Sequence, residues 1–228
     1  NTLQICLSHL LETTMETDYM SPKNYEIIER SRGWNGYFKL DVYRLRHDTF
    51  EGGKSAILDR EVLERGHAVA VLPYDPVRDE VVLIEQFRPG AISVQKTYPD
   101  MPLWLNEIVA GIIEDGEEPQ DVAHRETLEE SGCTIVGDLE YISRYYVTPG
   151  CSSETVTLYY GRVDSTNIGG IHGVVDEGED IRVYKVSAAE CFAMFQNRQL
   201  CNATATIAVQ WLMLNRDRIR KETSALRP

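Results

Sequence analysis

The apolar positions of the chain are densest between residues 68 and 84, where two short runs flank a Pro-Tyr-Asp-Pro turn. Residues 68–72 and 81–84 are almost wholly apolar, which is typical of strands buried on both faces. Residues 108–110, 156–160 and 181–186 have a similar composition. We therefore expect all five segments to be strands of one core sheet.

The segment before this core follows a different pattern. Residues 37–45 alternate apolar and polar side chains with a period of two, as in a strand with one buried face. Residues 57–63 are a candidate for its hairpin partner. The pattern predicts a tail over residues 1–24, a small antiparallel β-unit over residues 25–66 and a main domain over residues 67–228.

Three segments have the features of helices. Residues 119–131 begin with proline and are followed by glycine, which are start and stop signals of a helix. Residues 188–196 form a second candidate. Residues 203 to about 221 carry an apolar stripe, with Asn202 or Thr204 as the capping residue.

Composition identifies a globular protein and limits its partners. The 228 residues are 43% hydrophobic and 26% charged, and the formal net charge is −13. Nucleic acid and anionic membranes favour a positive surface, so neither is expected as a partner. An anionic ligand must instead be held by local cations, by a metal ion or by both.

Cysteine usage indicates a reducing compartment. The five cysteines are odd in number and scattered, without a Cys-x-x-Cys pair, which predicts free thiols and a cytoplasmic protein. No apolar run reaches the ~18 residues of a membrane span, and the first residues do not resemble a signal peptide. The cysteines are Cys6, Cys133, Cys151, Cys191 and Cys201.

The candidate chemistry lies on the first predicted helix. Glu126, Glu129 and Glu130 occupy positions i, i+3 and i+4, so their carboxylates share one face. Such a face is often only solvated surface. Here a strand end and a glycine loop lead into the helix and can bring a backbone carbonyl beside the carboxylates, a donor set that suits Mg²⁺. We expect Ala123 and Leu128 to form the buried side of the helix and the carboxylates to be exposed.

The wider spacing resembles the Nudix box of hydrolases that act on nucleoside diphosphates linked to another group. Gly111, five residues, Glu117 and seven residues precede Arg-Glu-Thr-Leu-Glu-Glu-Ser-Gly, which begins at Arg125. Thr127 and Cys133 replace the usual aliphatic residues, and both are packing positions.

The resemblance extends beyond the box and is closest to the ADP-ribose pyrophosphatase branch. It implies an α/β fold, a Nudix α/β/α sandwich with a mixed sheet, plus the small N-terminal β-unit exchanged between subunits of a homodimer. The matching segments outside the box are residues 37–43, 64–68, 75–88, 148–150 and 176–183.

The resemblance also implies roles for the box residues. Glu126 and Glu130, with the backbone carbonyl of Ala110, would ligate Mg²⁺, for which Mn²⁺ could substitute. Glu129 would assist metal binding, and Arg125 would pair with a box glutamate and orient it.

A second acidic segment, residues 176–180, precedes a predicted strand. Alone it would be a solvated loop, or a loose likeness of a calcium loop without the required frame. Beside a Nudix box, the resemblance implies that Glu177 is the general base and that Glu179 completes the metal site. The two roles could be exchanged.

Four residues outside these acidic segments are candidates for substrate binding. Arg88 and Arg60 could hold phosphate or ribose oxygens, Arg60 in the partner's site of the implied dimer. Tyr37 matches a position of the ADP-ribose pyrophosphatase branch at which an aromatic residue stacks on adenine, although a tyrosine in a strand is as often a core residue. Glu154 could accept a hydrogen bond from a ribose hydroxyl.

The resemblance implies Mg²⁺-dependent hydrolysis of ADP-ribose to AMP and ribose 5-phosphate. The box recognises the diphosphate and not the attached group, so GDP-mannose or ADP-glucose is an alternative substrate. A non-catalytic module that senses ADP-ribose is a third hypothesis, and the complete set of box glutamates argues against it.

Overall fold

The computed structural model describes residues 24–174, 176 and 178–225. The chain divides into two compact units, one ending at Val62 and the other beginning at Leu63. The elements are β1 (Tyr25–Asn35), β2 (Lys39–His47), β3 (Leu58–Glu64), β4 (His67–Asp75), β5 (Glu80–Phe87), η1 (Pro89–Ala91), β6 (Trp104–Glu107), β7 (Val109–Ile113), α2 (Pro119–Ser131), β8 (Glu140–Tyr146), β9 (Thr155–Arg162), β10 (Gly170–His172), β11 (Ile181–Ser187), α3 (Ala188–Gln196) and α4 (Ala203–Ala225).

The N-terminal unit is built on a three-stranded sheet in the order β1-β2-β3, with β1 and β2 antiparallel. The expected pairing of residues 57–63 with the preceding strand is confirmed, because β3 lies beside β2. The expected strand over residues 37–45 begins later, at Lys39. Tyr37 lies in the turn between β1 and β2 with 85% of its surface exposed, so it is not a core tyrosine.

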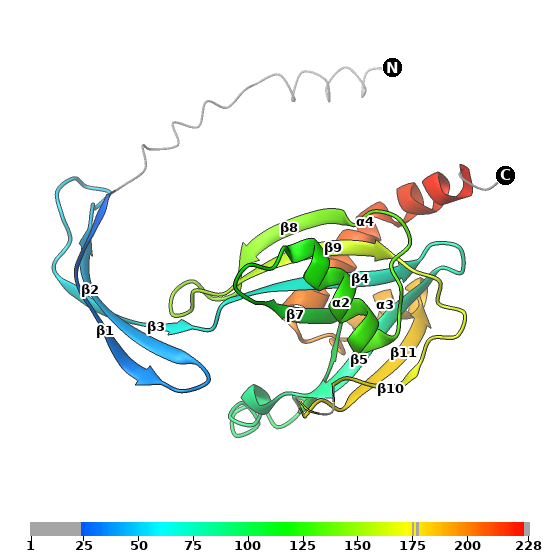
Figure 1. The fold of residues 1–228 in the computed structure, drawn as a ribbon, viewed down its shortest axis with the longest axis horizontal. Helices are drawn as coiled ribbons and strands as arrows, with labels where there is room; N and C mark the ends of the chain where they lie inside the picture. The colour runs from blue at the N-terminus through cyan, green and yellow to red at the C-terminus, as the bar shows by residue number, and fades with distance from the viewer. Residues whose placement is uncertain (1–23, 175, 177, 226–228) are drawn as a thin grey trace, which may run out of the picture. The chain divides into compact units, whose positions relative to one another are not determined.

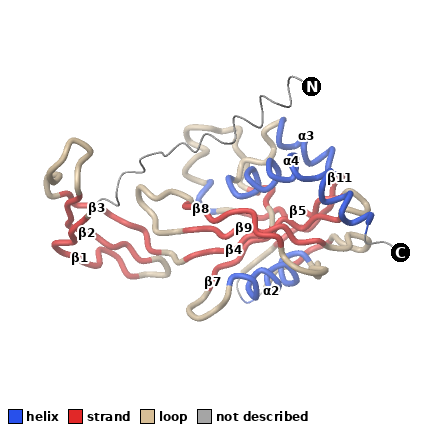
Figure 2. The backbone as a smooth tube through the Cα atoms, turned by 90° about the horizontal axis from the view of Figure 1, so that it is seen from above, coloured by secondary structure: helices blue, strands red, loops and turns tan. Residues whose placement is uncertain are grey.

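The main unit contains a mixed sheet in the order β10-β11-β5-β4-β9-β8, while β6 pairs with β5 and β7 with β4. Strand β4 runs parallel to β9 and antiparallel to β5 and β7. Figure 1 shows this sheet, and Figure 2 shows α2 on one face with α3 and α4 on the other. The predicted α/β/α sandwich with a mixed sheet is confirmed.

Alternating side chains of the central strands supply two separate cores. On the α2 face, Val69 and Val71 of β4 and Val82 and Ile84 of β5 pack with Val122 of the helix. The neighbouring positions of the same strands face α3 and α4. Because both faces are covered, these strands are apolar at nearly every position, which is why the sequence pattern identifies them.

Helix α2 has the predicted bounds, and Gly132 ends it in the left-handed region at φ 68°. Ala123 is fully buried, as predicted, but the other predicted buried residue is not. Leu128 is 56% exposed, whereas Thr127 is fully buried. Thr127 can occupy this position because its hydroxyl donates to the carbonyl of Ala123 at 2.6 Å, so no polar group is left unpaired.

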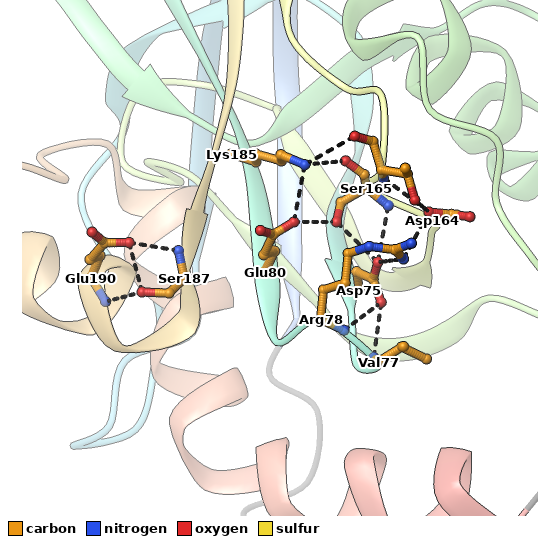
Figure 3. A network of polar contacts seen from close by, with 10 residues as sticks. Asp75, Val77, Arg78, Glu80, Asp164, Ser165, Lys185, Ser187 and Glu190 are labelled. Carbon is orange, nitrogen blue, oxygen red and sulfur yellow. Dashed lines mark hydrogen bonds and ion pairs between the residues drawn. The ribbon is translucent and has the colours of Figure 1, made fainter.

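The turn between β4 and β5 is fixed by a buried carboxylate, shown in Figure 3. Asp75 accepts hydrogen bonds from the backbone N–H groups of Val77 at 2.9 Å, Arg78 at 3.1 Å and Ser165 at 3.1 Å. Burial raises the pKa of Asp75, but hydrogen bonds from the backbone and side chains of Ser165 and Arg78 outweigh it and lower the pKa overall. The turn is thereby tied to the segment that follows β9.

The two C-terminal helices have capped N-termini. Helix α3 has the predicted bounds and a capping box between Ser187 and Glu190. Before α4, Asn202 accepts a hydrogen bond from the N–H of Ala205 at 3.1 Å and is therefore its cap. In the described part of the chain, no helix is both long and apolar enough to cross a membrane.

Candidate active site

Strand β7 and helix α2 meet so closely that two box glutamates lie against the strand. The backbone N–H of Ala110 donates to Oε2 of Glu130 at 2.9 Å. A Cβ atom placed on Gly111 would lie 2.0 Å from Oε1 of Glu126, inside contact distance. Glycine at this position therefore leaves room for the Glu126 side chain beside the strand.

Glu130 is only 2% exposed, contrary to the expectation that both metal-binding carboxylates are open to solvent. Burial raises the pKa of Glu130 to about 8, and the negative charges of Glu126 and Glu179 raise it further. The hydrogen bond from the Ala110 N–H and the charge of Arg88 act in the opposite direction and lower it. Burial also raises the pKa of Glu126, opposed by Arg125. The prediction of exposure is wrong because the turn of α2 that carries Glu130 faces the sheet.

Arg125 is the cation of the box helix. Its Nη1 contacts Oε1 of Glu126 at 2.9 Å and Oε2 of Glu129 at 3.1 Å, and its Nη2 lies 3.6 Å from Oε1 of Glu117. These contacts correspond to the orienting role that the resemblance implies. One guanidinium thus contacts three carboxylates, which leaves a net negative charge on this face of α2.

The second acidic segment is attached to the end of α2. The N–H of Gly173 donates to the carbonyl of Glu129 at 3.4 Å. Oε2 of Glu179 accepts from the N–H of Val174 at 2.9 Å, and its charge acts on Glu126 and Glu130. Glu177, the candidate base, lies outside the described residues.

Arg88 follows β5, and its charge lowers the pKa of Glu130 against the dominant effect of burial. Its guanidinium is held by Glu107, at 2.8 Å from Nη2 to Oε2. Sequence analysis did not identify Glu107. The available signal was an acidic residue directly before the apolar run that forms β7.

The other three candidates have local contacts. Glu154 is 8% exposed and its Oε1 lies 2.9 Å from Nη1 of Arg65, so this carboxylate has an ionic partner within the main unit. Arg60 is on β3 and donates to the carbonyl of Asp59 at 2.8 Å. Tyr37 packs its ring against Phe38 with centroids 4.8 Å apart.

The donor set fits a hard divalent cation. Glu126, Glu130 and Glu179 are carboxylates that repel one another, and with the carbonyl of Ala110 they provide only oxygen donors. Over residues 24–174, 176 and 178–225, no three acidic, histidine or cysteine side chains already converge as a closed metal cage. A cation would draw the carboxylates together and offset the cost of burying Glu130.

Comparisons with known proteins agree with this geometry. Residues 64–201 match the model of the NUDIX domain. The ADP-ribose pyrophosphatase of Escherichia coli (strain K12) is 45% identical over 197 residues, which cover 86% of this chain and 91% of that protein. The ADP-ribose pyrophosphatase of Haemophilus influenzae is 37% identical over 200 residues, 88% of this chain and 91% of that protein.

Two further matches are more distant. A GDP-mannose pyrophosphatase of Enterobacter sp. (strain 638) is 29% identical over 202 residues, covering 83% of this chain and 95% of that protein. A crystal structure of an ADP compounds hydrolase superposes with a TM-score of 0.59 at 17% identity, covering 85% of this chain and 97% of its own. The latter likeness concerns the fold alone.

Proposed function

Because this chain belongs to the NUDIX family, we propose that it is a pyrophosphohydrolase that cleaves the diphosphate of ADP-ribose to AMP and ribose 5-phosphate. The observation that carries the proposal is the carboxylate group on α2, with Glu130 buried against the N–H of Ala110. A buried acidic group without an equal number of cations is suited to a metal-assisted reaction and not to structural stability.

Mg²⁺ is the proposed cofactor, with Mn²⁺ as a substitute. Glu126, Glu130, Glu179 and the carbonyl of Ala110 would hold it, and Glu129 would assist. When bound, a divalent ion stabilises charge on the diphosphate and makes a water molecule easier to deprotonate. We choose Mg²⁺ because these carboxylates and the backbone carbonyl provide only oxygen donors, which hard divalent cations prefer.

The protein groups would divide the remaining work. Arg88 would hold the diphosphate, and Arg125 would keep Glu126 and Glu129 oriented. Glu177 would accept the proton of the attacking water, with Glu179 as the alternative base. The water oxygen forms the new bond to phosphorus as the bridging P–O bond breaks.

The proposal includes a homodimer whose N-terminal unit contributes Arg60 and Tyr37 to the partner's site. The large exposure of Tyr37 supports a role in contacts outside its own sheet. We also place the enzyme in the cytoplasm, a prediction supported by its free thiols. Of the described cysteines, Cys133, Cys151, Cys191 and Cys201 are free.

The test is a substrate panel with defined products. ADP-ribose, ADP-glucose and GDP-mannose are incubated with Mg²⁺ or with excess chelator, and the products are separated by chromatography. We expect AMP and ribose 5-phosphate from ADP-ribose, with the highest kcat/KM of the panel, and no turnover in chelator. Faster cleavage of GDP-mannose would favour the second substrate class.

Two variants test the site within the same assay. Glu126→Gln removes a proposed ligand and should lower turnover by several orders of magnitude. Gln95→Ala, a change in the exposed segment after η1, should retain wild-type turnover. No hydrolysis of any diphosphate by the folded wild type would support the sensing hypothesis instead.

A further inference from the structure

Glu107 is a buried carboxylate at the end of β6, and both of its oxygens have a specific donor. Its side chain is 5% exposed. Oε2 accepts from Nε of Arg88 at 2.9 Å and lies 2.8 Å from Nη2. Oε1 accepts from Nδ2 of Asn202 at 2.7 Å. A buried charge with this pattern is held in one orientation.

The grip on Arg88 fixes the plane of its guanidinium. Two N–H groups from one edge converge on a single carboxylate oxygen, which restricts rotation of the group. The backbone is fixed as well, since the N–H of Arg88 donates to the carbonyl of Leu103 at 2.9 Å. The arginine side chain remains 42% exposed, and its charge acts on Glu130. The edge of the guanidinium that Glu107 does not hold is therefore open to a ligand.

Asn202 connects this pair to helix α4. Its Oδ1 accepts from the N–H of Ala205 at 3.1 Å, while its Nδ2 donates to Glu107. A single amide group thus caps the helix with one end and holds the carboxylate with the other. The cap fixes the direction of the amide, and the amide in turn fixes the carboxylate.

We propose that Glu107 is a positioning residue, locked by Asn202, which sets the orientation in which Arg88 receives the diphosphate. The inference rests on the phosphate-binding role that the proposed function gives to Arg88. Glu107 itself does not touch the substrate. Its contribution is to remove rotational freedom from Arg88 before the substrate binds.

A purely structural ion pair would behave differently. Its loss would lower stability and leave the kinetics of the folded enzyme unchanged. If Glu107 positions Arg88, its loss weakens the binding of the substrate and of the transition state by the same amount. This raises KM and leaves kcat nearly constant.

The sharpest variant is Asn202→Ser. Serine caps a helix about as well as asparagine but lacks the amide donor, so α4 keeps its cap and Glu107 loses its lock. Asn106→Ser is the matched control on β6, because the hydrogen bonds of the Asn106 side chain are with Tyr184 and the carbonyl of Gln199 and not with Arg88 or Glu107. Glu107→Gln keeps nearly the same side-chain shape but removes the negative charge that holds Arg88.

The assay is steady-state kinetics on the diphosphate that the wild type cleaves fastest, with thermal unfolding of each variant. We expect Asn202→Ser and Glu107→Gln each to raise KM by about 10-fold or more, the range of a charge-assisted hydrogen bond. Their kcat should stay within about twofold of wild type, and Asn106→Ser should leave both parameters unchanged. An unchanged or lower KM in either test variant overturns the proposal.

The Arg88→Ala background separates this proposal from the proposed function. If Glu107 acts through Arg88, then Glu107→Gln should produce no further rise in KM once Arg88 is alanine. An equal rise in both backgrounds overturns the positioning role. If Arg88→Ala alone leaves KM unchanged, the assignment of Arg88 to the diphosphate is wrong and the inference falls with it.

Discussion

The burial of Glu130 leads to a prediction about the metal-free protein: Glu130→Gln should make the free energy of unfolding less dependent on pH. The carboxylate is 2% exposed and accepts from the N–H of Ala110 at 2.9 Å. A glutamine side chain has nearly the same shape, and its amide oxygen can accept the same hydrogen bond. The substitution therefore removes the titrating group with little change in packing.

The magnitude follows from the pKa of Glu130. An unfolded chain releases this proton near pH 4.5, whereas in the folded protein burial raises the pKa to about 8. Raising the pH through this window favours the unfolded state, because only that state ionises freely. At about 1.4 kcal/mol for each pH unit, the free energy of unfolding falls by about 2 to 3 kcal/mol between pH 5 and pH 7.

The assay is urea unfolding from pH 5 to pH 8 in excess chelator. The glutamine amide adds donors that need partners, but that cost is the same at every pH, so the slope is the decisive quantity. Glu129→Gln is the matched control on the same helix at a more exposed position, and it should follow the wild-type slope. If the free energy of unfolding changes with pH equally in wild type and Glu130→Gln, the account of Glu130 as a buried titrating group is refuted.

Three further predictions concern the site and the assembly. Gly111→Ala should displace Glu126, because the new methyl group would overlap that flexible side chain, and should raise the Mg²⁺ concentration needed for half-maximal turnover by at least about 10-fold. Gly150→Ala, which has open space around it, should match wild type in the same metal titration. Glu177→Gln should lower kcat by ~10²-fold or more with an unchanged Mg²⁺ requirement, while Glu179→Gln should raise that requirement, and the reverse pattern would exchange the two roles. Light scattering should report twice the chain mass, and Arg60→Ala should raise KM in that dimer, whereas a fully active monomer would exclude Arg60 from the site.

The main sheet could be predicted where burial on both faces leaves a dense apolar run. Strands β4 and β5 are examples, and the proline and glycine at the ends of α2 gave its bounds. Strand β1 was not predicted because all of its residues are exposed, so no alternation marks a buried face. Strand β8 was missed because a bulge between Tyr141 and Ser143 interrupts the period of two.

The candidate site also has features that the sequence could predict and features that it could not. Spacing along one helix placed Glu126, Glu129 and Glu130 together, because the period of a helix is fixed. Spacing could not show that Glu130 is buried, since that depends on which side of α2 meets β7. It also could not reveal the contact between Glu107 and Asn202, which are 95 positions apart and meet only in the folded chain.

The charges of the site imply an order in which its parts must act. In the proposed function Glu126, Glu129, Glu130 and Glu179 would face a substrate that is itself an anion, and the chain as a whole carries a net charge of −13. The cationic charge of Arg125 is already engaged by box glutamates. In the proposed function Arg88 is the cation left for the diphosphate, which would approach more readily once a divalent cation has offset the remaining negative charge, so we expect metal affinity and substrate affinity to be coupled. The acidity that makes the metal-free site costly to fold would thus also make substrate binding depend on the metal.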